Sequence, residues 1–213
     1  MPTDAQLAAA ARAVSYRCQQ LAGTARLIGR PNALLKFDID EDGWSPALTV
    51  TNAVVESALI NARAIAFFVV AGRKGEARAV DFERVRRNSA PGVPSQEIVE
   101  LARTRILGPV SAHLAHVMHD RKLQNDQEPT HPGAWPIPEL ALVLVGAVAD
   151  LVGSLEPAWA LKFRPDPRFY AAMLAPLQHQ RTIPSRHRSV RRLAQSLHSY
   201  LDHVPNADAQ LSL

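Results

Sequence analysis

Two charged residues lie within an apolar stretch of the sequence, where they could hold phosphate or move a proton. Glu56 and Arg63 are seven positions apart in a mostly apolar run from residue 46 to residue 71. On an α-helix this spacing leaves about 20° between their directions around the axis, two turns apart. A buried charge must find a partner or reach water, because burying it alone costs several kcal/mol. The pair therefore predicts either a buried ion-pair network between helices or a charged pocket.

A second cluster of polar residues follows further along the chain. His113, His116 and Asp120 fall within about 60° on a helical wheel, whereas His119 and Arg121 point elsewhere. Two imidazoles and a carboxylate on one face can bind a divalent metal, and a histidine can also act as a general acid or base near neutral pH. A metal-dependent helical enzyme is therefore one alternative. The preferred expectation has no metal and no cofactor.

Positive charge concentrates towards the C-terminus. The chain has 24 Lys and Arg against 20 Asp and Glu, a net charge of +4. From Lys162 to Arg192 there are eight cations and one acid, Asp166. Arginine makes bidentate contacts with phosphate, so this stretch could bind RNA or another polyanion, although a solvated basic face is the simpler interpretation. The predicted nucleic-acid-binding residues are Arg181, Arg186, Arg188, Arg191 and Arg192.

Helical signals cover the N-terminal half of the chain. Thr3 and Gln6 match a capping box for an alanine-rich helix that runs to about residue 27. Pro46 begins a long helix to about residue 71, which is apolar nearly all round and is expected to be the central helix of the domain. Ser95 can cap a third helix from 96 to about 122, with a kink at Pro109.

Further helices are expected at 137–155, 168–180 and 186–203, and no stretch shows sustained period-two alternation. The predicted fold class is therefore all-α, a bundle of five or six helices. We expect a single domain spanning 1–213, with its core at about 46–156 and a basic C-terminal helical segment at 160–204.

The sequence carries no targeting signal that we can identify. Its N-terminus lacks the pattern of a signal peptide, and the apolar stretch 137–155 contains Glu139 and Asp150, which favours a buried helix over a membrane span. Nucleotide-binding and serine-hydrolase motifs are also missing from the sequence, and its single cysteine excludes an intrachain disulfide. We therefore expect a cytoplasmic protein without membrane contact.

The two polar clusters resemble segments of a known family. NARAIAFF at 61–68 and VSAHLAHVMHDR at 110–121 are similar to the "ARxLxxFF" and "AHLxxxR"-like helices of uncharacterised bacterial proteins related to HEPN-type domains. The resemblance covers about residues 50–122, a third of the chain. The recurrent positions of those proteins are occupied here by Arg63, Phe67, His116 and Arg121.

The resemblance implies a helical bundle, frequent dimerisation and, in active members, metal-independent RNA cleavage. Active members use an arginine and a histidine separated by four to six residues. No arginine precedes His116 at that spacing, and the matches in this chain are Arg181 with His187 and Arg191 or Arg192 with His198.

We therefore expect an RNA- or phosphate-ligand-binding or interaction module, of a defence or toxin–antitoxin type, that forms a homodimer. The alternative is a metal-independent endoribonuclease. In that case Arg63 and Arg121 would hold phosphate and His116 would move a proton from a ribose 2′-hydroxyl, with Glu56 facing them.

Overall fold

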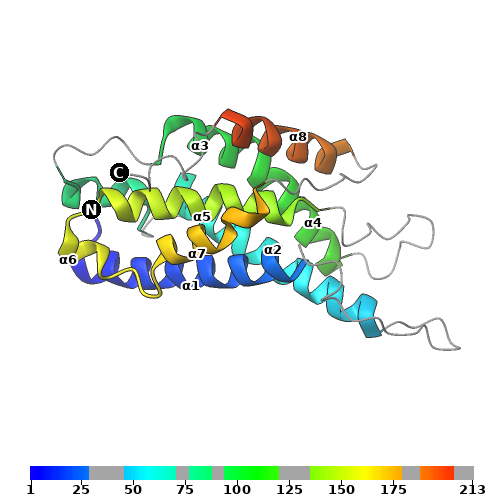
Figure 1. Ribbon diagram of the computed structural model, residues 1–213, viewed down its shortest axis with the longest axis horizontal. Helices are drawn as coiled ribbons and strands as arrows, with labels where there is room; N and C mark the ends of the chain where they lie inside the picture. The colour runs from blue at the N-terminus through cyan, green and yellow to red at the C-terminus, as the bar shows by residue number, and fades with distance from the viewer. Residues whose placement is uncertain (29–45, 71–76, 88–93, 120–134, 179–187, 204–213) are drawn as a thin grey trace, which may run out of the picture.

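The computed structural model describes residues 1–28, 46–70, 77–87, 94–119, 135–178 and 188–203, without the side chains of 46–49, 51, 113, 115–119 and 188–190. The described residues form an all-α bundle, which confirms the predicted fold class, although they contain eight α-helices rather than the predicted five or six (Figure 1). The α-helices are α1 (Asp4–Ile28), α2 (Pro46–Val70), α3 (Gln96–Leu101), α4 (Leu107–His119), α5 (Ile137–Ser154), α6 (Pro157–Ala160), α7 (Pro167–Leu174) and α8 (Arg188–His203). Two 3₁₀ turns, η1 (Ala79–Val85) and η4 (Ala175–Leu177), and one π-helical turn, η2 (Ala102–Ile106), accompany them.

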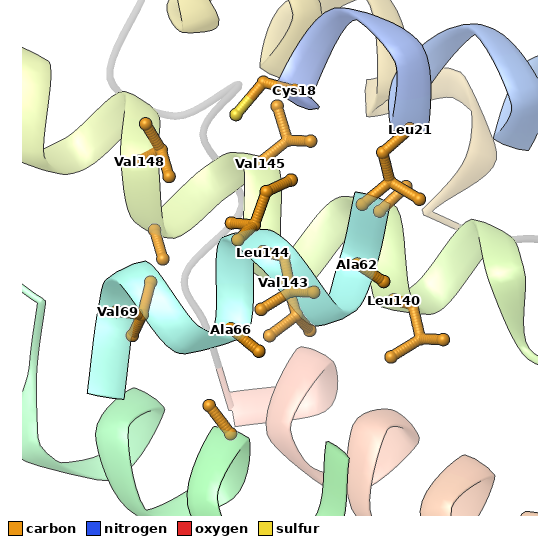
Figure 2. Packing of buried hydrophobic residues seen from close by; sticks show 14 of the residues in the cluster. Cys18, Leu21, Ala62, Ala66, Val69, Leu140, Val143, Leu144, Val145 and Val148 are labelled. Atoms are coloured by element: carbon orange, nitrogen blue, oxygen red, sulfur yellow. The ribbon is translucent and has the colours of Figure 1, made fainter. Parts of the chain in front are cut away.

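The most deeply buried helix is α5. Of its 18 residues, 14 are buried, and α1, α2, α7 and α8 all pack against it. In Figure 1 it runs through the middle of the bundle, with α1 on one side and α8 on the other. Figure 2 shows Leu144 and Val145 of α5 between Leu21 of α1 and Ala66 of α2. The sequence-based expectation that the helix from residue 46 is the central one was therefore wrong.

Helix α2 has a more open position than its composition suggests. Its segment Asn52–Val70 is apolar and long enough to cross a membrane, yet only 50% of it is buried, against 78% for the equivalent window of α5. Both helices pass a length and composition test for membrane spans. For α5, burial inside the bundle explains the apolar composition, whereas α2 keeps one side uncovered.

The first helix begins as its sequence predicts. The Thr3 amide donates to Gln6 Oε1 at 2.7 Å, and the Gln6 amide donates to Thr3 Oγ1 at 3.2 Å, which is the reciprocal pattern of a capping box. From there α1 contributes Leu7, Leu21 and Cys18 to the core, and burial raises the pKa of the Cys18 thiol. The core is therefore wider than the predicted 46–156, and α8 extends it further with Leu193 and Leu197.

The predicted helix from residue 96 forms, and Ser95 caps it by accepting a hydrogen bond from the Ile98 amide at 3.4 Å. It is irregular one turn earlier than expected, at the π-helical turn η2 rather than at Pro109 itself. A proline has no N–H to donate, and its ring crowds the carbonyl four residues before it, here that of Arg105. The π-helical turn lies just before this proline, and it divides the one predicted helix into α3, η2 and α4.

Candidate functional site

Glu56 lies on the side of α2 that faces α1. It lines an open cavity of about 290 Å³ between the two helices. The other lining residues are Tyr16, Arg17, Gln20, Ala53, Ser57, Ile60 and Asn61. Among the described residues Glu56 forms no ion pair or hydrogen bond, although the guanidinium of Arg17 lines the same cavity. Glu56 therefore lies in an open depression of the surface, where the nearby cation comes from α1.

Arg63 has a different environment, against α4. Its Nε donates to Ser111 Oγ at 3.0 Å, and its guanidinium lies 5.1 Å from the ring centroid of Phe67. The side chain is half-buried and does not line the cavity that contains Glu56. The structure thus does not bring Glu56 and Arg63 together, because they lie two turns apart along α2, one beside the cavity shared with α1 and the other in contact with α4.

The remaining residues of the predicted catalytic site cannot be placed around Arg63. His116 belongs to α4, but its side chain lies outside the described residues, as does that of His113. Arg121 and Asp120 fall in 120–134, also outside them. In the described part of the chain no group of three His, Cys, Asp or Glu residues could hold a metal ion.

A buried carboxyl group lies between α5 and α8. From the sequence this residue, Glu139, could be identified only as a charge in an apolar stretch. Glu139, in the first turn of α5, has no exposed surface, and its Oε1 is 2.9 Å from Nε2 of His198 on α8. The imidazole is itself 24% exposed. One ring nitrogen is therefore held by the buried carboxyl group while part of the ring reaches the surface. Such an arrangement fixes both the orientation and the tautomer of a histidine.

Basic residues gather at the N-terminal half of α8. Arg191 and Arg192 are exposed there, and η2, which packs against α8, exposes Arg103 and Arg105. Within the described part of the chain only Arg103 of these four has a carboxylate partner, Glu100 at 3.7 Å, and both members of that pair are largely exposed. We call these four arginines the basic face. Of the predicted nucleic-acid-binding residues, Arg188 begins α8 without a described side chain, and Arg181 and Arg186 lie outside the described residues.

The other half of α8 has one carboxylate and no lysine or arginine. Asp202 is exposed near its C-terminal end. Burial, together with the nearby carboxylates of Glu97 and Asp150, raises the pKa of Tyr200 to about 12. The positive charge of α8 is therefore confined to its first turns. Sequence reasoning missed Arg103 and Arg105, because only the tertiary structure shows that η2 packs against α8. The proline at 109 was the one local signal of irregularity there.

The Arg63 contacts predict a structural role for this side chain. Arg63→Ala should lower the free energy of unfolding by about 1–3 kcal/mol, because it removes a hydrogen bond from a charged donor and a cation–π contact. Ser111→Ala should reproduce part of the loss, and Arg12→Ala, at an exposed position of α1, serves as the control. Urea unfolding followed by circular dichroism measures all three. An unchanged stability of Arg63→Ala would mean that the guanidinium does not hold α2 to α4.

The contact between the buried Glu139 and His198 predicts that the stability of the fold depends on His198. His198→Ala should lower the free energy of unfolding by about 1–3 kcal/mol, since it removes a partner from the fully buried Glu139. His203→Ala, an exposed histidine of the same helix, should change it by less than about 0.5 kcal/mol. Thermal and urea unfolding of the two variants make the comparison, and equal effects would contradict this role of His198.

Comparison with known proteins does not assign this chain to a family. No protein-family model matches the sequence, and no curated protein or solved structure matches it either. The HEPN resemblance of residues 50–122 therefore stays a prediction from the sequence, and the function has to be inferred from the residues and their geometry.

Proposed function

We propose that this protein is a cytoplasmic RNA-binding module, or more generally a module that binds a ligand through its phosphates, and that the basic face is its contact surface. The observation that carries the proposal is that α8, with Arg191 and Arg192 exposed in its first turns, packs against η2, where Arg103 and Arg105 are exposed. Each pair comes from a different part of the sequence.

The placement of these arginines is not explained by helix stability. A helix gains stability from cations near its C-terminus or from cations paired with carboxylates, and the dipole effect falls off within the end turns. Arg191 and Arg192 are the fourth and fifth residues of α8 and have no described carboxylate partner, so neither effect applies to them. A bound phosphate would be stabilised by charge-assisted hydrogen bonds from the guanidinium groups. This supports anion binding over a merely solvated surface.

Removal of two of these arginines should weaken RNA binding and its dependence on salt. For a fluorescein-labelled single-stranded RNA of mixed sequence, the slope of log Kd against log salt concentration should fall by about 1.4 in Arg191→Ala/Arg192→Ala, at about 0.7 per phosphate contact. Fluorescence anisotropy at several salt concentrations gives the slope. Arg84→Ala/Arg164→Ala removes the same charge from exposed positions outside the basic face and should leave the slope unchanged. Equal losses in both double variants would reduce the effect to net charge and contradict the proposal.

A second candidate function is metal-independent RNA cleavage on the same side of the bundle. The contact between His198 and the buried Glu139 favours it, because a carboxyl group that orients a histidine is a common device for general acid–base catalysis. Arg191 is seven positions before His198, so the two lie on one stripe of α8, about two turns apart. In this proposal the arginine binds phosphate and His198 accepts a proton from a ribose 2′-hydroxyl. The alternative that assigns this task to His116 is tested in the same way.

Cleavage of total cellular RNA in excess EDTA tests both assignments. If His198 is the base, His198→Ala should lower the cleavage rate by at least about a hundredfold, in the usual range for loss of a general base. His116→Ala should then cleave at the wild-type rate, and the reverse result would assign the reaction to His116. If the wild-type protein binds RNA without cleaving it, the nuclease proposal is rejected and the RNA-binding proposal stands.

A further inference from the structure

The face formed by the outer sides of α1 and α2 leaves large apolar side chains uncovered. Tyr16 of α1 is 51% exposed and Ile60 of α2 is 49% exposed, and both line the cavity between the helices. Leu27 and Val50 are exposed further along the same two helices. We call the cavity lining together with Leu27 and Val50 the α1–α2 face. It is the uncovered side of α2 that leaves only half of its apolar window buried.

Opposite charges lie within this face without pairing. Arg17 donates from Nη1 to Asn61 Oδ1 at 3.0 Å, and the Asn61 amide in turn donates to the Ser57 carbonyl at 2.7 Å. Asn61 is only 3% exposed, so a buried side chain fixes the direction of the guanidinium. Glu56 lines the same cavity and has no ion-pair partner among the described residues. Each charge is therefore available to a partner that presents the opposite one.

We infer that the α1–α2 face is the contact surface of a homodimer with two-fold symmetry. A two-fold axis parallel to the helix pair places α1 of one copy over α2 of the other. Arg17 and Glu56 line one cavity and so lie at the same level along the pair. The axis therefore sets Arg17 of each copy opposite Glu56 of the other. Tyr16 and Ile60 come to lie around these two ion pairs and exclude water from them, as aromatic and apolar residues do at the centre of interfaces.

The charges of the face fit a second copy of the chain, because Arg17 and Glu56 line one cavity and each can meet its opposite charge across a two-fold axis. A lipid surface fits less well, because Arg17, Glu56 and Gln20 lie at the centre of the face, where charged groups in hydrocarbon are unfavourable. The face lies across the bundle from α8, so this inference does not rest on the proposed RNA binding (Figure 1).

Reversing the charge of Arg17 in one variant and of Glu56 in another tests the inference. Arg17→Glu places two carboxylates opposite each other at both ends of the symmetric contact, and Glu56→Arg does the same with two guanidinium groups. Each variant alone should dimerise at least about tenfold more weakly than wild type, because like charges in an interface are strongly unfavourable. An equimolar mixture of the two variants should recover a heterodimer, since each copy then meets the opposite charge. Sedimentation velocity over a range of concentrations measures the Kd of each sample.

Ile60→Asp should also abolish the dimer, and Phe169→Asp, at an exposed position of α7, should leave it intact. Circular dichroism checks that every variant is folded. A wild-type protein that stays monomeric at about 100 μM, or a dimer that survives both charge reversals, would overturn the inference. The inference would also be overturned if the wild-type protein, as a monomer, bound vesicles of neutral phospholipid and Ile60→Asp abolished that binding. The α1–α2 face would then contact a membrane. If a variant of the basic face binds RNA more weakly but still forms the dimer, the result concerns only the RNA-binding proposal. The dimer proposal and the RNA-binding proposal can therefore fail independently of each other.

Discussion

A helix that is apolar on almost every side is stable in water only when other helices cover all of it, and in this bundle that helix is α5. Fourteen of its 18 residues are buried, and α1, α2, α7 and α8 supply the cover. Burial of this much apolar surface is the main favourable term in folding. The positions of the surrounding helices follow from it, because each must present its own apolar stripe to α5. The faces that remain free for function are those that α5 does not use.

The buried Glu139 makes the position of α8 more specific than apolar contact alone would. Leu193, Leu197 and Leu201 pack α8 onto the bundle, but leucine stripes tolerate small shifts along a helix. The hydrogen bond between Glu139 and His198 does not, because a shift of one residue would leave a carboxyl group buried without this partner. The register of α8 decides in turn which of its turns lies beside η2. The basic face thus depends on a polar contact in the interior.

The two surfaces that carry the functional proposals lie on different sides of α5. Helix α8 and η2 form the basic face, whereas α1 and α2 form the opposite side of the bundle (Figure 1). A dimer through the α1–α2 face would leave both basic faces free and turned outwards. Two such faces on one particle can bind one long RNA together, and the second contact then benefits from a high effective concentration. Self-association and anion binding are therefore compatible in this fold and can reinforce each other.

Much of the architecture could be predicted from local signals. The capping box at Thr3, the serine cap at Ser95 and the stripe of leucines in α8 give the helices and their limits to within a few residues, because these features act between residues three or four positions apart. The charge of the C-terminal segment could likewise be read from composition. Periodicity also showed that Glu56 and Arg63 share a direction on α2.

Only the tertiary structure decided what each of these residues meets. Glu56 and Arg63 were expected to act together, but α1 lies against one and α4 against the other. Glu139 and His198 are 59 positions apart and pair because α8 returns across the start of α5. Composition alone could not predict that α5 is more deeply buried than α2, since both helices are apolar enough to be central. Helical periodicity depends only on residues that are close in the sequence. A site depends on which helices pack together, and that is determined by how the apolar faces of all the helices are buried in one core.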